Sequence, residues 1–72
     1  MRVACGPGES LDATKLIGQR LAKAQATASA VGCSVRPVEI GGRHLTITMD
    51  TETWRIDVAV RGSVITELRG RG

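Results

Sequence analysis

Residues 55–68 have the sequence RIDVAVRGSVITEL, which contains two strand patterns around a turn. Apolar and polar residues alternate in its first six positions, an Arg-Gly-Ser turn follows, and the last five positions are again rich in β-branched residues. Such alternation is typical of a half-buried strand, and two strands around a short turn containing glycine predict a β-hairpin. Ile56, Val58 and Val60 are expected to face the core.

A further strand is predicted upstream, at residues 34–40, because apolar residues alternate there before Gly41 and Gly42. Pro37 lacks a backbone N–H and therefore suggests an edge strand. The alternation places Val35 and Pro37 on one face and Arg36, Val38 and Ile40 on the other.

Between residues 11 and 32 the composition favours a helix, with Ser10 as a candidate N-cap. Gly18 disfavours a continuous helix, so we expect a short turn at residues 12–17 and the true helix at residues 20–31. Gly32 supplies the C-terminal stop. One apolar stripe suited to packing on a sheet then contains Leu21, Ala24, Ala28 and Val31.

The chain of 72 residues holds a single domain, residues 1–72. Residues 1–10 contain turn residues without periodicity and are expected to form an irregular N-terminal arm. Cys5 and Cys33 allow one disulfide that ties this arm to the body, or they are two separate buried thiols. The opening residues lack the apolar region of a signal peptide, so the protein is either cytoplasmic or an exported protein whose signal has been removed.

Ten basic and seven acidic residues give a formal net charge of +3. The arginines are spread along the chain, and Trp54 is the only aromatic residue, so the basic patch with stacking rings that many nucleic-acid binders use is not evident. No apolar run is long enough to span a bilayer. His44 and the two cysteines lack metal-ligand spacing, and so small a domain offers no enclosed cavity for a catalytic nucleophile. The sequence therefore predicts neither an enzyme nor a cofactor or metal site.

The connection between the predicted strands, residues 41–54, is too long for a hairpin turn and is rich in threonine and β-branched residues. A long loop in a small domain is usually functional. The alternative is that Leu45–Met49 forms one more strand.

The residues of this connection and its flanks resemble a known family. The runs ITMD at 47–50, RIDV at 55–58 and ITEL at 65–68, with Gly72 at the end, resemble the potato inhibitor I type of serine protease inhibitor. The likeness is closer to the related small microbial inhibitors with a Thr-Met-acid triplet. LIGQ at 16–19 also resembles the element that precedes the single helix of that family.

The resemblance implies an α+β fold with one α-helix packed on a small mixed β-sheet. A long extended binding loop, residues 44–54, joins two parallel strands and occupies a protease active site as a substrate would. Met49 and Asp50 then form the reactive bond, with Met49 in the primary specificity pocket. The other loop residues are Thr46, Ile47, Thr48, Thr51 and Glu52.

Loop support is implied for Arg55, which would hold the loop from the sheet by hydrogen bonds. Family members usually have a second arginine where this chain has Asp57, so Arg69 or Arg71 is a candidate for the missing support. Microbial relatives often join the N-terminal arm to the C-terminus by a disulfide, but this C-terminus has no cysteine.

The implied partner is therefore a serine protease of the chymotrypsin, elastase or subtilisin type, because a methionine suits an apolar pocket. The resemblance favours a secreted protein that acts as a monomer, without nucleic acid or membrane as partner. The alternative function is a small intracellular protein-interaction or nucleic-acid-binding module on the same scaffold. That module would use Arg36, Arg43, Arg69 and Arg71.

Overall fold

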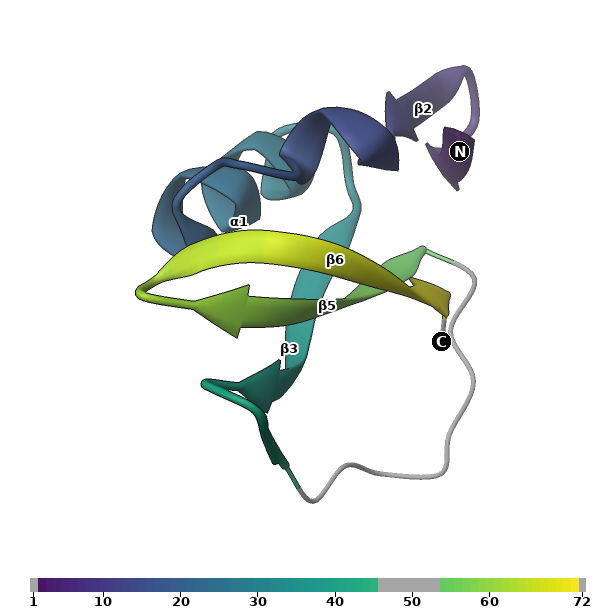
Figure 1. The fold of residues 1–72 in the computed structure, drawn as a ribbon. Helices are drawn as coiled ribbons and strands as arrows, with labels where there is room; N and C mark the ends of the chain where they lie inside the picture. The colour runs from purple at the N-terminus through teal and green to yellow at the C-terminus, as the bar shows by residue number, and fades with distance from the viewer. Residues whose placement is uncertain (1, 46–53, 72) are drawn as a thin grey trace.

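The computed structural model describes residues 2–45 and 54–71 of the chain. One α-helix packs against a four-stranded mixed sheet, and a separate two-stranded hairpin stands at one end, so the expected α+β class is confirmed (Figure 1). The elements in chain order are β1 (Arg2–Gly6), β2 (Glu9–Asp12), the 3-10 helix η1 (Ala13–Leu16), α1 (Leu21–Ser29), β3 (Ser34–Ile40), β4 (Arg43–His44), β5 (Arg55–Arg61) and β6 (Val64–Arg71).

The large sheet has the strand order β4-β3-β5-β6. β3 and β5 are parallel, whereas β4 and β6 are antiparallel to their neighbours. The hairpin predicted for residues 55–68 is confirmed, with Arg61 paired to Val64. Its two-residue turn has φ of 57° at Gly62 and 65° at Ser63, the positive values of a type I′ turn, whose twist matches that of the flanking strands.

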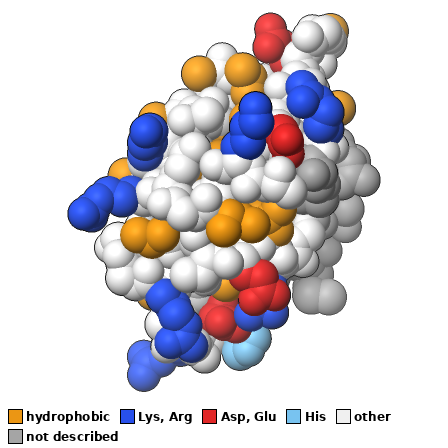
Figure 2. Space-filling view, turned by 45° about the horizontal axis from the view of Figure 1, so that its top comes forward, with side chains coloured by type: hydrophobic (Ala, Val, Ile, Leu, Met, Phe, Trp, Pro, Cys, Tyr) orange, Lys and Arg blue, Asp and Glu red, His pale blue; other side chains and the backbone are white. Residues whose placement is uncertain are grey.

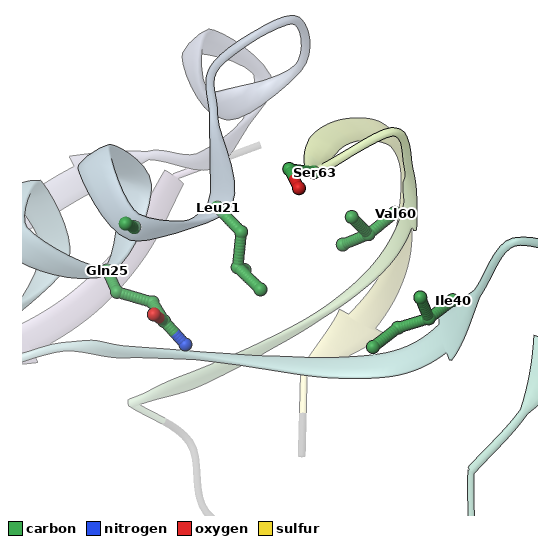
Figure 3. Close-up of a pocket in the computed structure, with 6 residues that line it drawn as sticks. Leu21, Gln25, Ile40, Val60 and Ser63 are labelled. Carbon is green, nitrogen blue, oxygen red and sulfur yellow. The ribbon is translucent and has the colours of Figure 1, made fainter.

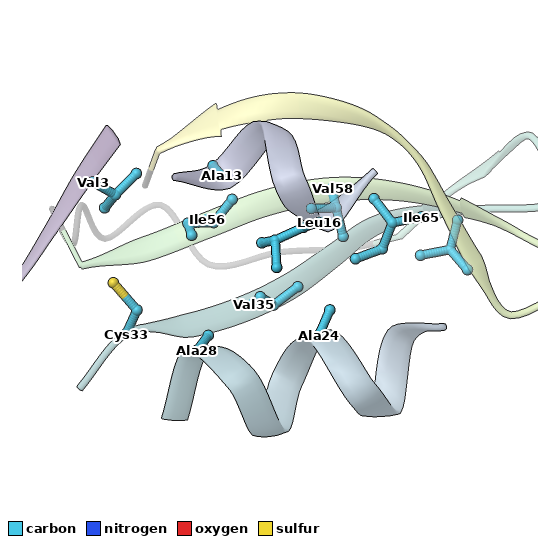
Figure 4. Close-up of a cluster of buried hydrophobic side chains, with 11 residues drawn as sticks. Val3, Ala13, Leu16, Ala24, Ala28, Cys33, Val35, Ile56, Val58 and Ile65 are labelled. Atoms are coloured by element: carbon cyan, nitrogen blue, oxygen red, sulfur yellow. The ribbon is translucent and has the colours of Figure 1, made fainter. Parts of the chain in front are cut away.

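The core lies between α1 and the sheet, as Figure 4 shows. Ala24 and Ala28 are fully buried on the helix face toward the sheet, and the other two residues of the predicted stripe, Leu21 and Val31, are half-buried. Small alanines let the helix approach the sheet closely, so branched aliphatic residues of the strands fill the core. The other core members include Val3, Ala13, Leu16, Val35, Ile56, Val58, Val60 and Ile65.

The predicted break at Gly18 is confirmed, because η1 ends before it and α1 begins after it. Gly18 has φ of 89°, a conformation that glycine adopts at little cost. Ser10 is not the N-cap that we expected. It lies in β2, and Asp12 instead caps η1 by accepting a hydrogen bond from the backbone N–H of Thr14.

The N-terminal segment is not irregular, contrary to the prediction for residues 1–10. β1 and β2 form an antiparallel hairpin around Pro7 and Gly8. The hairpin is held to the body in two ways, by the fully buried side chain of Val3 and by a disulfide between Cys5 and Cys33. Of the two states left open for the cysteines, the structure has the disulfide.

Pro37 lies in an inner strand rather than an edge strand, because β3 has β4 on one side and β5 on the other. However, β4 pairs only with Glu39 and Ile40, so within residues 2–45 and 54–71 the first part of β3 has no strand on that side. There the Gln25 side chain donates a hydrogen bond to the Val35 carbonyl, 3.4 Å away, and Pro37 offers no N–H to a further strand.

Candidate functional site

The candidate site is built on the connection between the parallel strands β3 and β5. Because the strands are parallel, the chain leaves β3 at Ile40 and enters β5 at Arg55, which is paired with Ser34 at the opposite end of β3. Parallel neighbours are usually joined by a helix. In the described part of this connection, the only regular element is β4, two residues long.

Both ends of the connection are attached to β3. The Leu45 N–H donates to the Val38 carbonyl at 3.0 Å, and the Trp54 carbonyl accepts from the Ser34 N–H at 3.1 Å. Residues 46–53 lie outside the described residues. The predicted reactive bond and the other predicted loop residues fall there: Thr46, Ile47, Thr48, Met49, Asp50, Thr51 and Glu52.

Arg55, the predicted loop support, is the first residue of β5 and directly follows Trp54. Its neighbour Ile56 is fully buried in the core, so the alternation of a strand places the Arg55 side chain on the opposite face of the sheet. We call this the outer face, and on β5 it carries Arg55, Asp57 and Ala59. Arg55 is half-buried on this face.

Asp57, which stands where the resembling family has a second arginine, is bound by Arg36 of β3. The Arg36 Nε donates to Asp57 Oδ1 and its Nη2 to Oδ2, both at 2.9 Å. Their side chains are only 18% and 14% exposed. This two-point geometry fixes both side chains and is stronger than a single contact between exposed charges.

Arg69, a candidate loop support, reaches across β5 to β3. Its Nη2 lies 2.9 Å from Glu39 Oε1, and its Nη1 lies 3.6 Å from Glu67 Oε1. His44 Nε2 lies 3.5 Å from the same Glu39 oxygen, while the His44 side chain is 81% exposed at the end of β4. The backbone of Arg71 pairs with Ile56. The side chain of Arg71 is outside the described part of the chain, so the predicted role of Arg71 as loop support stays a prediction.

Sequence reasoning missed the ion pairs of Arg36 and Glu39. The alternation at residues 34–40 places Arg36 on the face opposite Val35 and Pro37, but its partner depends on the register between two strands that are far apart in the chain. The structure pairs Arg36 directly with Asp57 in that register. If the register had been known, the opposite charges of Arg36 and Asp57 at facing positions would have predicted their ion pair.

Of the four arginines of the alternative function, the three with described side chains do not form a common group. Arg36 is bound to Asp57, and Arg69 is bound to Glu39, so carboxylates neutralise both. Arg43 lies exposed on β4. On the face shown in Figure 2, basic side chains are spread over several places rather than gathered in one patch, and some of them lie beside acidic side chains.

Over residues 2–45 and 54–71, His, Cys, Asp and Glu side chains do not gather in any group of three that could hold a metal ion. Within the same ranges, neither helix has the length and hydropathy needed to cross a membrane. No family model matches the chain, and no curated protein or solved structure is significantly similar to it.

Proposed function

We propose that this protein is a serine protease inhibitor of the potato inhibitor I type, which acts by a substrate-like reversible mechanism. Residues 44–54 are its binding loop, and the bond between Met49 and Asp50 is its reactive bond. The target is a chymotrypsin-like, elastase-like or subtilisin-like enzyme, whose apolar pocket takes the Met49 side chain.

One observation carries the proposal: the two ends of this connection are hydrogen-bonded to one strand, β3, inside a four-stranded sheet. A loop binds a protease tightly only when it loses little conformational entropy on binding. Fixing both ends to a single strand limits that loss. The sequence between the ends, with Thr48, Met49 and Asp50, is the part that resembles the known reactive loops.

The charge arrangement on the outer face also supports the proposal. Arg55 follows the loop directly, and a guanidinium offers several donors in one plane to loop acceptors. Beside it, the Arg36–Asp57 pair places a second guanidinium on the outer face, from β3 rather than from β5. The chain thus has a cation next to the position where the family usually has its second arginine.

The proposal is tested by two substitutions assayed against chymotrypsin and trypsin. Met49→Lys should weaken inhibition of chymotrypsin and create inhibition of trypsin, because the trypsin pocket requires a cation. Arg55→Ala should weaken inhibition or turn the protein into a substrate that is cleaved within residues 44–54. Arg61→Ala, at the far and exposed end of the same strand, is the matched control and should inhibit as the parent does. If Met49→Lys and Arg55→Ala both inhibit chymotrypsin and trypsin as the parent protein does, the proposed site is wrong.

A further inference from the structure

A second surface, separate from the connection between β3 and β5, has the properties of a binding site. It is a hollow of about 290 Å³ between the start of α1, the end of β3 and the β5–β6 turn. The hollow is lined by Leu21, Ala22, Gln25, Ile40, Val60 and Ser63. Figure 3 shows the side chains of Leu21, Ile40 and Val60 directed toward the same space, with Gln25 and Ser63 at its margin.

The walls of the hollow are joined by backbone hydrogen bonds. The first N–H of α1, at Leu21, donates to the Ser63 carbonyl at 2.8 Å, and the Gly41 N–H donates to the Val60 carbonyl, also at 2.8 Å. Helix, turn and strand are therefore fixed to one another without a ligand. A preformed site of this kind binds with a small ordering cost.

Apolar side chains remain open to solvent at this hollow. Ile40 is 45% exposed, and Leu21 is half-buried, whereas Val60 at the floor is only 2% exposed. A volume near 290 Å³ is at the lower limit of pockets for small-molecule ligands and suits one or two side chains of a partner better than a large cofactor.

Three arginines adjoin lining residues of the hollow in the sequence or in the strand register. Arg20 directly precedes Leu21, and Arg43 is paired with Ile40, so its side chain is on the same sheet face as Ile40. The Arg61 Nη2 lies beside the β3–β4 turn, 3.3 Å from the position that a Cβ on Gly42 would take. Within residues 2–45 and 54–71, none of these three arginines has an ion pair with a carboxylate.

Glu39, the acidic residue that adjoins the lining residue Ile40 in the sequence, is bound elsewhere. It precedes Ile40 but is bound to Arg69 of β6. Asp57 and Asp12 are also engaged, with Arg36 and Thr14. Among the described residues, an apolar hollow with three arginines beside it that lack a carboxylate partner is complementary to an apolar side chain flanked by carboxylates.

We propose that this hollow docks a segment of a partner protein that presents one aliphatic side chain between acidic residues. The aliphatic side chain enters between Leu21, Ile40 and Val60, and the carboxylates lie against Arg43, Arg61 and Arg20. The concave form of the site favours a protein side chain over a bilayer surface, which would be met by projecting apolar residues. The proposal is independent of protease inhibition.

The test is a titration of the full, isotope-labelled chain with the peptide Glu-Asp-Leu-Asp-Glu, whose two ends are chemically blocked. Binding is monitored by the NMR chemical shifts of the protein's backbone amides. Shifts should be confined to the lining residues and their neighbours. Two control peptides, one with glycine for leucine and one with amides for all carboxylates, should each bind about tenfold more weakly or not at all.

Two variants locate the site. Ile40→Ser, at an exposed position that does not endanger the fold, should weaken the peptide about fivefold to tenfold. Arg61→Gln should weaken it about threefold and reduce its dependence on salt. Arg2→Gln on the N-terminal hairpin is the matched control and should have no effect.

The proposal would be overturned if the peptide caused no shifts at the lining residues, or if the peptide with amides for carboxylates bound as tightly as the acidic peptide. It would also be overturned if Ile40→Ser bound the acidic peptide as tightly as the parent protein does. Shifts at the lining residues with anionic phospholipid vesicles but not with the peptide would overturn it as well. Sedimentation without peptide tests a second copy as the occupant. A dimer that is lost in Ile40→Ser would also contradict a partner segment at this site.

Discussion

Arg36 and Asp57 form a two-point ion pair across the parallel strands β3 and β5, with both N–O distances at 2.9 Å. Both side chains are largely buried on the outer face. Asp57→Ala leaves the Arg36 cation poorly solvated, so it should lower the free energy of unfolding by about 1.5–3 kcal/mol, as measured in urea.

Glu67→Ala is the matched control for that loss. Glu67 is 60% exposed and lies 3.6 Å from Arg69, so its removal should cost no more than about 0.5 kcal/mol. A double-mutant cycle with Arg36→Met isolates the pair, because Arg36 makes further interactions. If the effects of Arg36→Met and Asp57→Ala are simply additive, the pair does not stabilise the sheet.

The disulfide between Cys5 and Cys33 should contribute strongly to stability. It closes a loop with a sequence separation of 28 residues, for which the chain-entropy relation gives about 3.6 kcal/mol. Cys5→Ser with Cys33→Ser should therefore unfold at clearly lower urea concentration. Hydrogen exchange in the variant should accelerate first in β1 and β2. A reduction in stability below about 1 kcal/mol would show that apolar packing, by Val3 and Leu11, holds the hairpin without the disulfide.

Gly32 and Gly18 provide a matched comparison of two glycines with nearly equal φ, 88° and 89°. A Cβ on Gly32 would stand 2.9 Å from the Cys5 carbonyl oxygen, whereas one on Gly18 would have no neighbour within 4 Å. Gly18→Ala should cost only the left-handed strain, about 1–2 kcal/mol. Gly32→Ala should cost more, because the backbone of β1 must shift. Equal melting temperatures for the two variants would contradict this difference.

Asp12 makes the stability of the N-terminal half depend on pH. The Thr14 hydroxyl, which donates to Asp12 Oδ1 at 2.6 Å, is the main cause that holds the pKa of Asp12 below its ordinary value of 3.8, and burial opposes it. The charged cap therefore stabilises the fold fully above pH 3.8, and this contribution is lost as the pH falls through the lower pKa of the folded state.

The measurement is the difference in melting temperature between the parent and Asp12→Asn across acidic pH. The asparagine keeps a capping oxygen but cannot be charged, so the parent should be more stable near neutral pH and lose this advantage under acid. An advantage that grows as the pH falls would contradict the role given to the Asp12 carboxylate.

Much of the fold follows from local sequence. The β5–β6 hairpin follows from the alternation at Ile56, Val58 and Val60 and from the turn at Gly62-Ser63, where glycine takes positive φ at little cost. The helix ends are set by Gly18 and Gly32. In contrast, β1 and β2 have only five and four residues, too few for a periodic signal, and their stability comes from Cys33 and the core, both distant in the chain.

The candidate site was less predictable for a related reason. Arg55 could be singled out from its place after the loop, but the partners of Arg36 and Arg69 depend on register and on a bulge in β3 between Pro37 and Glu39. Pro37 illustrates the same limit. No strand among the described residues pairs with this edge of β3 at Pro37, which lacks an N–H, yet β4 pairs with the same edge two residues further on, at Glu39.

Protease inhibition by residues 44–54 is tested by titrating the purified protein against subtilisin, chymotrypsin, elastase and trypsin, with mass spectrometry of each mixture. We expect tight inhibition of one or more enzymes with an apolar pocket, weak or no inhibition of trypsin, and at most slow cleavage between Met49 and Asp50. Rapid digestion of the chain, or no effect on any of the four enzymes, would contradict it.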